Sequence, residues 1–250
     1  MKAIFECNKQ KYQVNLAQPL DISLPLRHGN ANVMAWSQSP PDISPVTEGD
    51  FTGSVAKGAS VNFNNIFFNP HAHGTHTECV GHITEKIYSV NTQLKQFFFL
   101  AELITVAPEK DRNDFVISRK QLQNALGSNT PEALIIRTLP NDTEKYRKNY
   151  SQTNPPYLKE DAAHFIREIG VEHLLIDLPS VDKEKDEGRL LAHKAFWHIE
   201  GSIREKATIT ELIYVDNHIP DGSYLLNLQI APFENDATPS KPVLYSIQSN

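Results

Sequence analysis

Residues 69–83 read Asn-Pro-His-Ala-His-Gly-Thr-His-Thr-Glu-Cys-Val-Gly-His-Ile and hold four of the ten histidines of the chain. These histidines are His71, His73, His76 and His82, and the carboxylate of Glu78 lies among them. Histidine is a common metal ligand and the usual proton donor or acceptor near neutral pH. Polar side chains at this density are costly to bury without partners. The stretch therefore predicts a site for a divalent metal ion.

An extended backbone over residues 76–82 would place alternate side chains on one face. His76, Glu78 and His82 would then lie together, with His76 and Glu78 about 7 Å apart, near enough to bind one ion. A carboxylate has two oxygens, so Glu78 could bridge two ions. His82 would lie beside the ions and could move a proton between bound water and a leaving group.

The composition of the chain limits the partners that it could bind. At 250 residues it is long enough to bury a sizeable core, and we expect residues 1–250 to form a single domain. The formal net charge is −6, so we expect no nucleic-acid partner, because phosphate binding depends on Lys and Arg. We expect no membrane span and no signal peptide, since no apolar run is long enough. The only cysteines, Cys7 and Cys79, agree with a cytoplasmic protein.

The hydrophobic pattern predicts a mixed α/β fold rich in strands. Alternating or continuous apolar runs predict strands at 3–5, 12–16, 97–106, 133–138, 171–178, 207–215 and 224–231. Helices are predicted at 118–126, 159–169 and 190–198, the first with Ser118 and Gln121 as a capping box and Gly127 as its stop. Residues 28–60 form a long loop rich in Pro, Gly, Ser and Asn, which is typical of a binding loop.

The segment from Gly74 to Glu78, with His82 after it, resembles the motif H-x-G-T-H-x-D-x-P-x-H of the cyclase family, which includes bacterial kynurenine formamidase and isatin hydrolase. Further segments similar to those of the family follow in the right order, at 21–23, 155–158, 175–182, 191–194 and 209–212. The resemblance implies a swivelling β/β/α domain and one or two ions, Zn²⁺ or alternatively Mn²⁺. It also implies hydrolysis of amide bonds in aryl formamides, isatin or related compounds, by a homodimer or homotetramer.

The resemblance also assigns roles by position. It assigns metal binding to four residues, which are His76, Glu78, His193 and Glu211. It assigns the acid/base role to His82, and it places Trp36 near an aromatic residue that contacts the substrate. The spacing from His193 to Glu211 exceeds that of the family, so His198 is an alternative to His193.

The histidine stretch departs from the family motif in three places, one of which is Val80 at the position of the motif proline. Ala72 stands where the family has its first histidine, and Glu78 stands where it has Asp. On a regular strand His71 and His73 would face away from the site, so either could replace the missing ligand only if the backbone bulges near Gly74.

These observations predict a metal-dependent hydrolase that cleaves a carbon–nitrogen bond in a small molecule. The metal would lower the pKa of bound water towards about 7, and His82 would accept the proton and return it to the leaving nitrogen. The altered positions Ala72 and Glu78 leave open a binding protein on the same fold that has lost turnover. A dehydratase or a cyclising enzyme could use the same ions.

Overall fold

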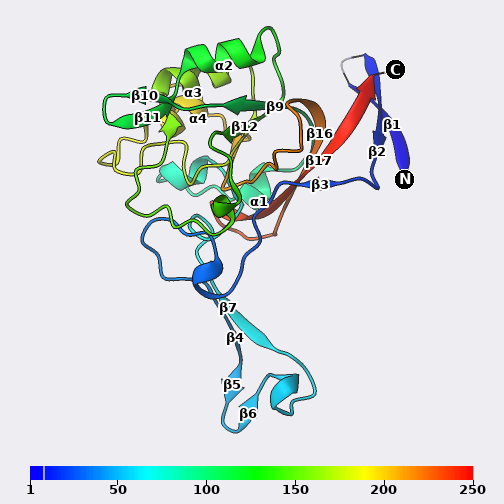
Figure 1. The fold of residues 1–250 in the computed structure, drawn as a ribbon, viewed down its shortest axis with the longest axis vertical. Helices are drawn as coiled ribbons and strands as arrows, with labels where there is room; N and C mark the ends of the chain where they lie inside the picture. Colours follow the sequence, from blue (N-terminus) through cyan, green and yellow to red (C-terminus); the bar gives the residue numbers. More distant parts are fainter. Residues whose placement is uncertain (8, 250) are drawn as a thin grey trace.

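A ring of seven strands forms the centre of the protein (Figure 1). The structure, a computed structural model, describes residues 1–7 and 9–249. The ring runs in the order β17, β16, β9, β12, β14, β15 and β8, and pairing of β8 with β17 closes it. The strands are β8 (His76–Glu78), β9 (Phe98–Val106), β12 (Ala133–Thr138), β14 (His173–Ile176), β15 (Thr208–Glu211), β16 (Gly222–Ile230) and β17 (Ala237–Ser249). Strands β9, β12, β14 and β15 are parallel to one another, and the other pairs in the ring are antiparallel.

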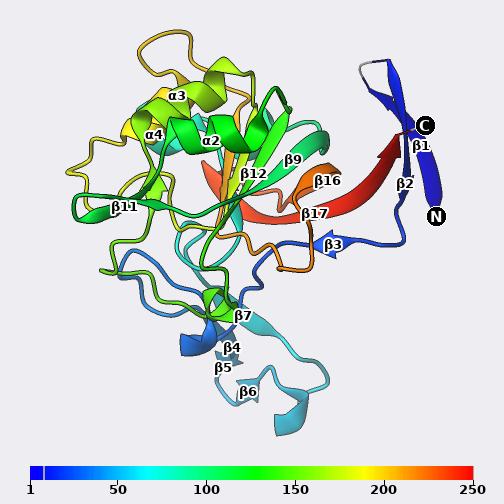
Figure 2. The same ribbon diagram turned by 45° about the horizontal axis from the view of Figure 1, so that its top comes forward.

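Three helices cover one side of the parallel strands (Figure 2). They are α2 (Arg119–Leu126), α3 (Glu160–Glu168) and α4 (Leu191–Trp197). Along β12, Leu134 and Ile136 pack with the helices, whereas Ala133 and Ile135 pack with side chains of β16 and β17. Every residue of β12 and β14 is buried, which explains their nearly continuous apolar sequences.

The predicted elements of the middle of the chain are confirmed to within a few residues. The helix expected from Ser118 is α2, where Ser118 and Gln121 form the capping box and Gly127 ends the helix. Residues 159–169 and 190–198 contain α3 and α4. The strands expected in this region correspond to the ring strands β9, β12, β14, β15 and β16. None of the described helices is long and apolar enough to cross a membrane.

Two extensions leave the ring. At one side the strands predicted at 3–5 and 12–16 are β1 (Lys2–Cys7) and β2 (Gln10–Asn15), which form a hairpin. This hairpin pairs with the far end of β17, while β3 (Leu20–Asp21) pairs nearer its middle. On another side, residues 42–67 project as a long arm (Figure 1). Its strands are β4 (Asp42–Pro45), β5 (Thr47–Glu48), β6 (Phe51–Thr52) and β7 (Asn64–Phe67). The long loop predicted at 28–60 therefore contains most of a two-stranded arm.

Shorter elements complete the chain. A small sheet consists of β10 (Glu109–Asp111), β11 (Asp114–Ile117) and β13 (Tyr157–Leu158). The remaining short helices are η1 (Gly29–Ala31), η2 (Val55–Lys57), η3 (Val80–Ile83), α1 (Val90–Gln93) and η4 (Thr143–Tyr146).

The prediction of one extended run over residues 76–82 is wrong. Strand β8 ends at Glu78, and η3 follows as a tight turn in which the amide of His82 donates to the carbonyl of Cys79 at 3.0 Å. Gly81 permits this turn because a Cβ there would collide with the backbone carbonyl of Tyr88. Residues 70–74 form a turn and bend, so strand parity does not apply to His71 or His73.

Candidate metal centre

Glu78 lies at the middle of a cluster of imidazoles and is fully buried. Its Oε1 lies 3.1 Å from Nε2 of His193 in α4, and its Oε2 lies 3.1 Å from Nδ1 of His71. Nε2 of His82, on η3, lies 3.8 Å from the same Oε2. The two oxygens of Glu78 therefore face two different groups of ring nitrogens.

Glu211 supplies a second carboxylate at the carboxyl end of β15. Strand β15 pairs antiparallel with β8, and Glu211 lies directly opposite His76 in that register. Its Oε2 lies 3.4 Å from Nε2 of His76, and its Oε1 lies 3.9 Å from Nε2 of His193. The amide of Val181 donates to Oε1 at 2.9 Å, which fixes the carboxylate. The cluster thus lies at the carboxyl edge of the parallel strands, where α/β sheets commonly bind ligands.

Three of the histidines share one arrangement. In each ring one nitrogen faces Glu78 or Glu211, and the other hydrogen-bonds an oxygen of a different residue. These outer contacts are His76 Nδ1 to the carbonyl of Gly74 at 3.0 Å, His193 Nδ1 to Asp182 Oδ2 at 2.6 Å, and His71 Nε2 to Asp236 Oδ2 at 2.9 Å. Histidines that bind metals are usually held in this way, because the outer acceptor fixes the tautomer and leaves the other nitrogen free for the ion.

Two atoms at the centre have no hydrogen-bond partner although they are buried. They are His76 Nε2 and Glu78 Oε2, and their neighbours in the cluster do not meet the geometry of a hydrogen bond with them. A buried polar atom without a partner costs about 1–3 kcal/mol. A cation bound between them would remove this cost.

The donor set fits a divalent metal ion. Three overlapping groups bring their ligand atoms within 4.8 Å of one another, and they are His71–His76–Glu78, Glu78–His82–His193 and His71–His82–Asp236. Imidazole nitrogens and carboxylate oxygens suit both zinc and manganese.

Protons on the imidazoles balance the negative charge of the cluster. Burial would lower the pKa of His71, but Asp236 and Glu78 outweigh it and raise the pKa to about 10. Burial would likewise lower the pKa of His193, but Asp182, Glu78 and Glu211 raise it to about 10. Burial opposes ionisation of Glu78, yet the surrounding imidazoles hold its pKa well below the usual value. The site therefore attracts positive charge.

The structure brings His71 to the cluster and leaves His73 apart from it. His73 is buried, its Nδ1 accepts from the amide of Asn69 at 2.9 Å, and it takes part in none of the three groups of converging ligand atoms. His198 also lies outside these groups, since it ends α4, whereas His193 points into the cluster.

A pocket of about 290 Å³ opens beside the cluster. Its lining includes His71, His82, His193 and Glu211 of the cluster, together with Trp36. The side chain of His82 keeps 31% of its exposure and stacks on His71 with ring centroids 4.3 Å apart. The indole N–H of Trp36 donates to the carbonyl of His71 at 3.2 Å. A substrate in this pocket would therefore contact both Trp36 and His82.

Two acidic residues of the site were not predicted. Asp182 lies in a segment that resembles the family, but no role was inferred for it. Asp236 lies in a bend directly before β17, without any motif around it. Strand pairing explains its position, because its neighbour Ala237 lies opposite Glu78 in the β17–β8 register.

The fold and the cluster define a strand-rich α/β protein with a buried histidine–carboxylate centre suited to a divalent metal ion. Comparison with known proteins identifies its family. Residues 14–183 match the family described as Putative cyclase, and the chain belongs to that cyclase family.

Curated relatives and solved structures agree with this assignment. The chain is 27% identical over 232 residues to a kynurenine formamidase of Bacillus cereus, covering 91% of this chain and 97% of the relative. It is 27% identical over 235 residues to a kynurenine formamidase of Bacillus mycoides, covering 92% of this chain and 99% of the relative. Isatin hydrolase A from Labrenzia aggregata, bound to benzyl benzoate, has a similar fold, with a TM-score of 0.67, 14% identity and coverage of 92% and 94%. The predicted fold class and the resemblance to the cyclase family are confirmed.

Proposed function

We propose that this protein is a metal-dependent hydrolase that cleaves the carbon–nitrogen bond of an aryl formamide or a cyclic aryl amide. One observation carries the proposal: three imidazoles, each held by an outer acceptor, direct their free nitrogens at two buried carboxylates. The relatives named kynurenine formamidase and the structural neighbours named isatin hydrolase support the substrate class.

The residues of the pocket support a proton-transfer role for His82. When bound, a divalent cation supplies a Lewis acid that polarises a carbonyl group and acidifies water. Nε2 of His82 faces the centre, and its ring lines the pocket, so it can accept a proton from water and donate it to the leaving nitrogen. Trp36 offers an aromatic face to a flat substrate.

We further propose one or two ions, Zn²⁺ or Mn²⁺, held by His71, His76, Glu78, His193 and Glu211. The two oxygens of Glu78 face different histidines, with His71 on one side and His193 on the other. Glu78 could therefore offer one oxygen to each of two ions.

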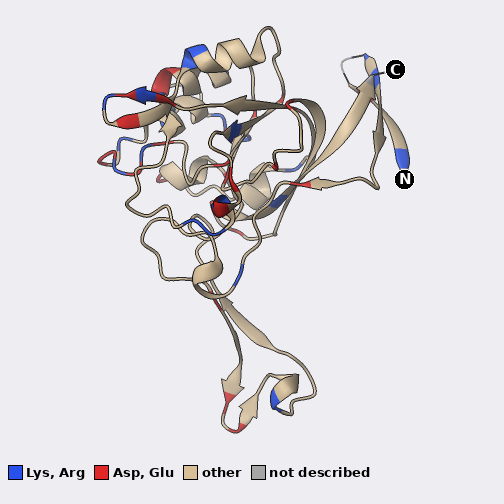
Figure 3. Ribbon diagram, viewed as in Figure 1, with Lys and Arg blue, Asp and Glu red and all other residues tan. Residues whose placement is uncertain are grey.

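We also propose that residues 1–250 act as one domain in a cytoplasmic homodimer or homotetramer. Both cysteines, Cys7 and Cys79, are free thiols, as is usual in a reducing compartment. The arm at 42–67 exposes several large apolar side chains, which are Phe51, Val55, Val61, Phe63, Ile66 and Phe67. From residue 59 to 67 it has no charged side chain (Figure 3). A two-stranded hairpin is marginally stable alone, so contact with a second copy would stabilise this arm.

Metal analysis combined with an activity screen tests the proposed function. Protein purified without chelators should contain one or two equivalents of zinc or manganese by plasma mass spectrometry. It should hydrolyse an aryl formamide or a cyclic aryl amide, and lose that activity on chelation. Less than a tenth of an equivalent of metal after reloading, or bound metal without turnover of formamides, cyclic amides or lactones, would count against it. The second result would favour the binding protein, and a dehydrated or cyclised product would favour the other class of enzyme.

A further inference from the structure

His71 occupies the cluster from a position next to the one that the family motif uses. Ala72, at the motif position, is fully buried and has no ligand atom. Three successive carbonyl groups in this turn accept hydrogen bonds from one segment of the chain. The donors are Trp36 Nε1 to His71 at 3.2 Å, the Ala35 amide to Ala72 at 3.0 Å, and Asn32 Nδ2 to His73 at 2.6 Å. The backbone of this turn is therefore fixed from outside the motif.

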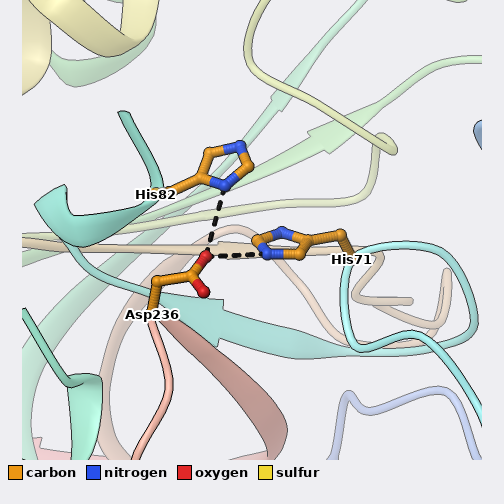
Figure 4. A group of neighbouring side chains, drawn as sticks. All are labelled: His71, His82 and Asp236. Atoms are coloured by element: carbon orange, nitrogen blue, oxygen red, sulfur yellow. Dashed lines mark hydrogen bonds and ion pairs between the residues drawn. The ribbon is translucent and has the colours of Figure 1, made fainter. Parts of the chain in front are cut away.

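The fixed backbone does not by itself determine the rotation of the His71 ring. Asp236 does, because its Oδ2 lies 2.9 Å from Nε2 of His71 (Figure 4). The Nδ1 atom of the same ring then faces Glu78 Oε2 at 3.1 Å. Without a contact at Nε2, rotation of the ring could exchange the two nitrogens.

The same carboxylate oxygen also faces His82. Asp236 Oδ2 lies 3.3 Å from Nδ1 of His82, while Nε2 of that ring points towards Glu78. The carbonyl of Asp236 accepts from the amide of Cys79 at 3.0 Å, directly before the turn that carries His82. The backbone of Asp236 is thus hydrogen-bonded to the residue before η3, and one oxygen of its side chain faces the rings of both His71 and His82.

We propose that Asp236 is a positioning residue that makes His71 the replacement for the ligand lost at Ala72 and that also orients His82. The inference rests on the proposed function, because it assigns Asp236 a role towards the same metal centre. Asp236 acts through the two imidazoles: its Oδ2 accepts Nε2–H of His71 and attracts Nδ1 of His82 at 3.3 Å, which leaves the opposite nitrogens for the ion and for proton transfer.

A double-mutant cycle on metal affinity tests the part that concerns His71. Asp236→Ala should weaken binding of Zn²⁺, measured by competition with a chromogenic chelator, by about 10- to 100-fold, as is typical when the outer partner of a ligating histidine is removed. His71→Ala should weaken it further, and the double variant should match His71→Ala, because Asp236 has no ring left to hold. Asp161→Asn, an exposed carboxylate on α3, is the matched control and should bind like the wild type.

The Co²⁺ spectrum and the turnover give independent readouts. Asp236→Asn keeps the shape of the side chain and guards against misfolding of the alanine variant. With Co²⁺ it should hold the same number of ions as the wild type but show shifted visible bands. At saturating metal it should still show a lower kcat at nearly unchanged KM, because His82 is misoriented.

Three results would overturn the proposal. Equal affinity of the wild type and both Asp236 variants would remove the role towards His71, while full recovery of kcat at saturating metal would remove the role towards His82. Loss of a whole ion equivalent in Asp236→Ala, also in the His71→Ala background, would make Asp236 a direct ligand instead. A wild-type protein that binds no metal would contradict the proposed function itself, so the two failures are distinguishable.

Discussion

At the scale of single residues, the protons on His71 and His193 determine how the centre takes up a cation. Both pKa values are about 10 because carboxylates outweigh the effect of burial. A metal ion at Nδ1 of His71 and Nε2 of His193 must displace one proton from each ring. Binding at pH 7 should therefore release up to two protons, and the apparent affinity should rise with pH until about 10.

Calorimetry in buffers of different ionisation enthalpy measures this proton release. The enthalpy of metal binding should vary linearly with the enthalpy of the buffer, with a slope near the number of protons released. His71→Ala should reduce the slope by about one proton, since its ring then has no proton to lose. A binding enthalpy independent of the buffer would contradict the predicted charge state of the metal-free site.

His82 should be needed for turnover and dispensable for metal binding. His82→Ala should lower kcat by about 10²- to 10⁴-fold, the usual contribution of a general acid or base. Its metal content should remain that of the wild type, because His71, His76, Glu78 and His193 are unchanged. Steady-state kinetics and metal analysis on the same preparation measure both effects, and a variant with full activity would exclude the proposed role.

At the scale of elements, the turn η3 controls where His82 lies. A Cβ on Gly81 would collide with the carbonyl of Tyr88, so Gly81→Ala must displace this turn. A displacement of about 1 Å can reduce a rate by about 100-fold. We expect a lower kcat with normal metal content, and a loss of about 1–3 kcal/mol in the free energy of unfolding from overpacking.

The background of His82→Ala provides the control for this substitution. If Gly81→Ala acts by moving His82, it should cost no further activity in that background. Urea unfolding of each variant measures the structural cost separately. Unchanged kcat in the single variant would show that the turn tolerates the methyl group.

The elements that local sequence determines were predictable, and those set by distant contacts were not. The helix α2 carries its own capping box in Ser118 and Gln121, and β12 is apolar throughout most of its length, so both could be predicted. The turn η3 depends on the close approach of Gly81 to Tyr88, and the hydrophobic periodicity of a strand cannot predict this contact. The sequence therefore predicted that His76, Glu78 and His82 lie together but placed His82 on the wrong type of element.

The choice between His71 and His73 depended on equally distant contacts. The carbonyls of the turn around them are held by Asn32, Ala35 and Trp36. The acceptor for His71 is Asp236, which lies beside His71 only because β17 pairs with β8. The motif spacing predicts that His76 and Glu78 lie together, because both are on one strand. It contains no information about these long-range pairings.

At the scale of the whole molecule, closure of the ring assembles the site. Strand β8 pairs with β15 on one side and with β17 on the other. The first pairing brings Glu211 opposite His76, and the second brings Asp236 beside the cluster. The metal centre thus depends on contacts of residues 76–78 with two strands in the last fifth of the chain. We therefore expect bound metal to stabilise the closed ring against unfolding.

The exposed side chains of the arm provide a test of the proposed assembly with a second copy. Phe63 and Ile66 are each 57% exposed, although this end of the arm comes just before the histidine stretch in the sequence. Burial of such side chains in an interface would stabilise an oligomer by about 25 cal/mol for each Å² of apolar surface removed from water. A charge at these positions would oppose that burial. Phe63→Asp combined with Ile66→Asp should therefore shift the protein to monomers in light scattering coupled to gel filtration.

The matched control for the arm is Phe115→Asp on β11, since Phe115 is 51% exposed but lies on a different sheet. This variant should keep the size of the wild type. The arm variant should also keep the unfolding temperature of the ring, because Phe63 and Ile66 belong to neither of the buried apolar clusters that include side chains of β12. A monomeric wild type, or an arm variant that remains an oligomer, would exclude the arm as the interface, whereas dissociation of the arm variant alone would identify residues 42–67 as the contact between copies.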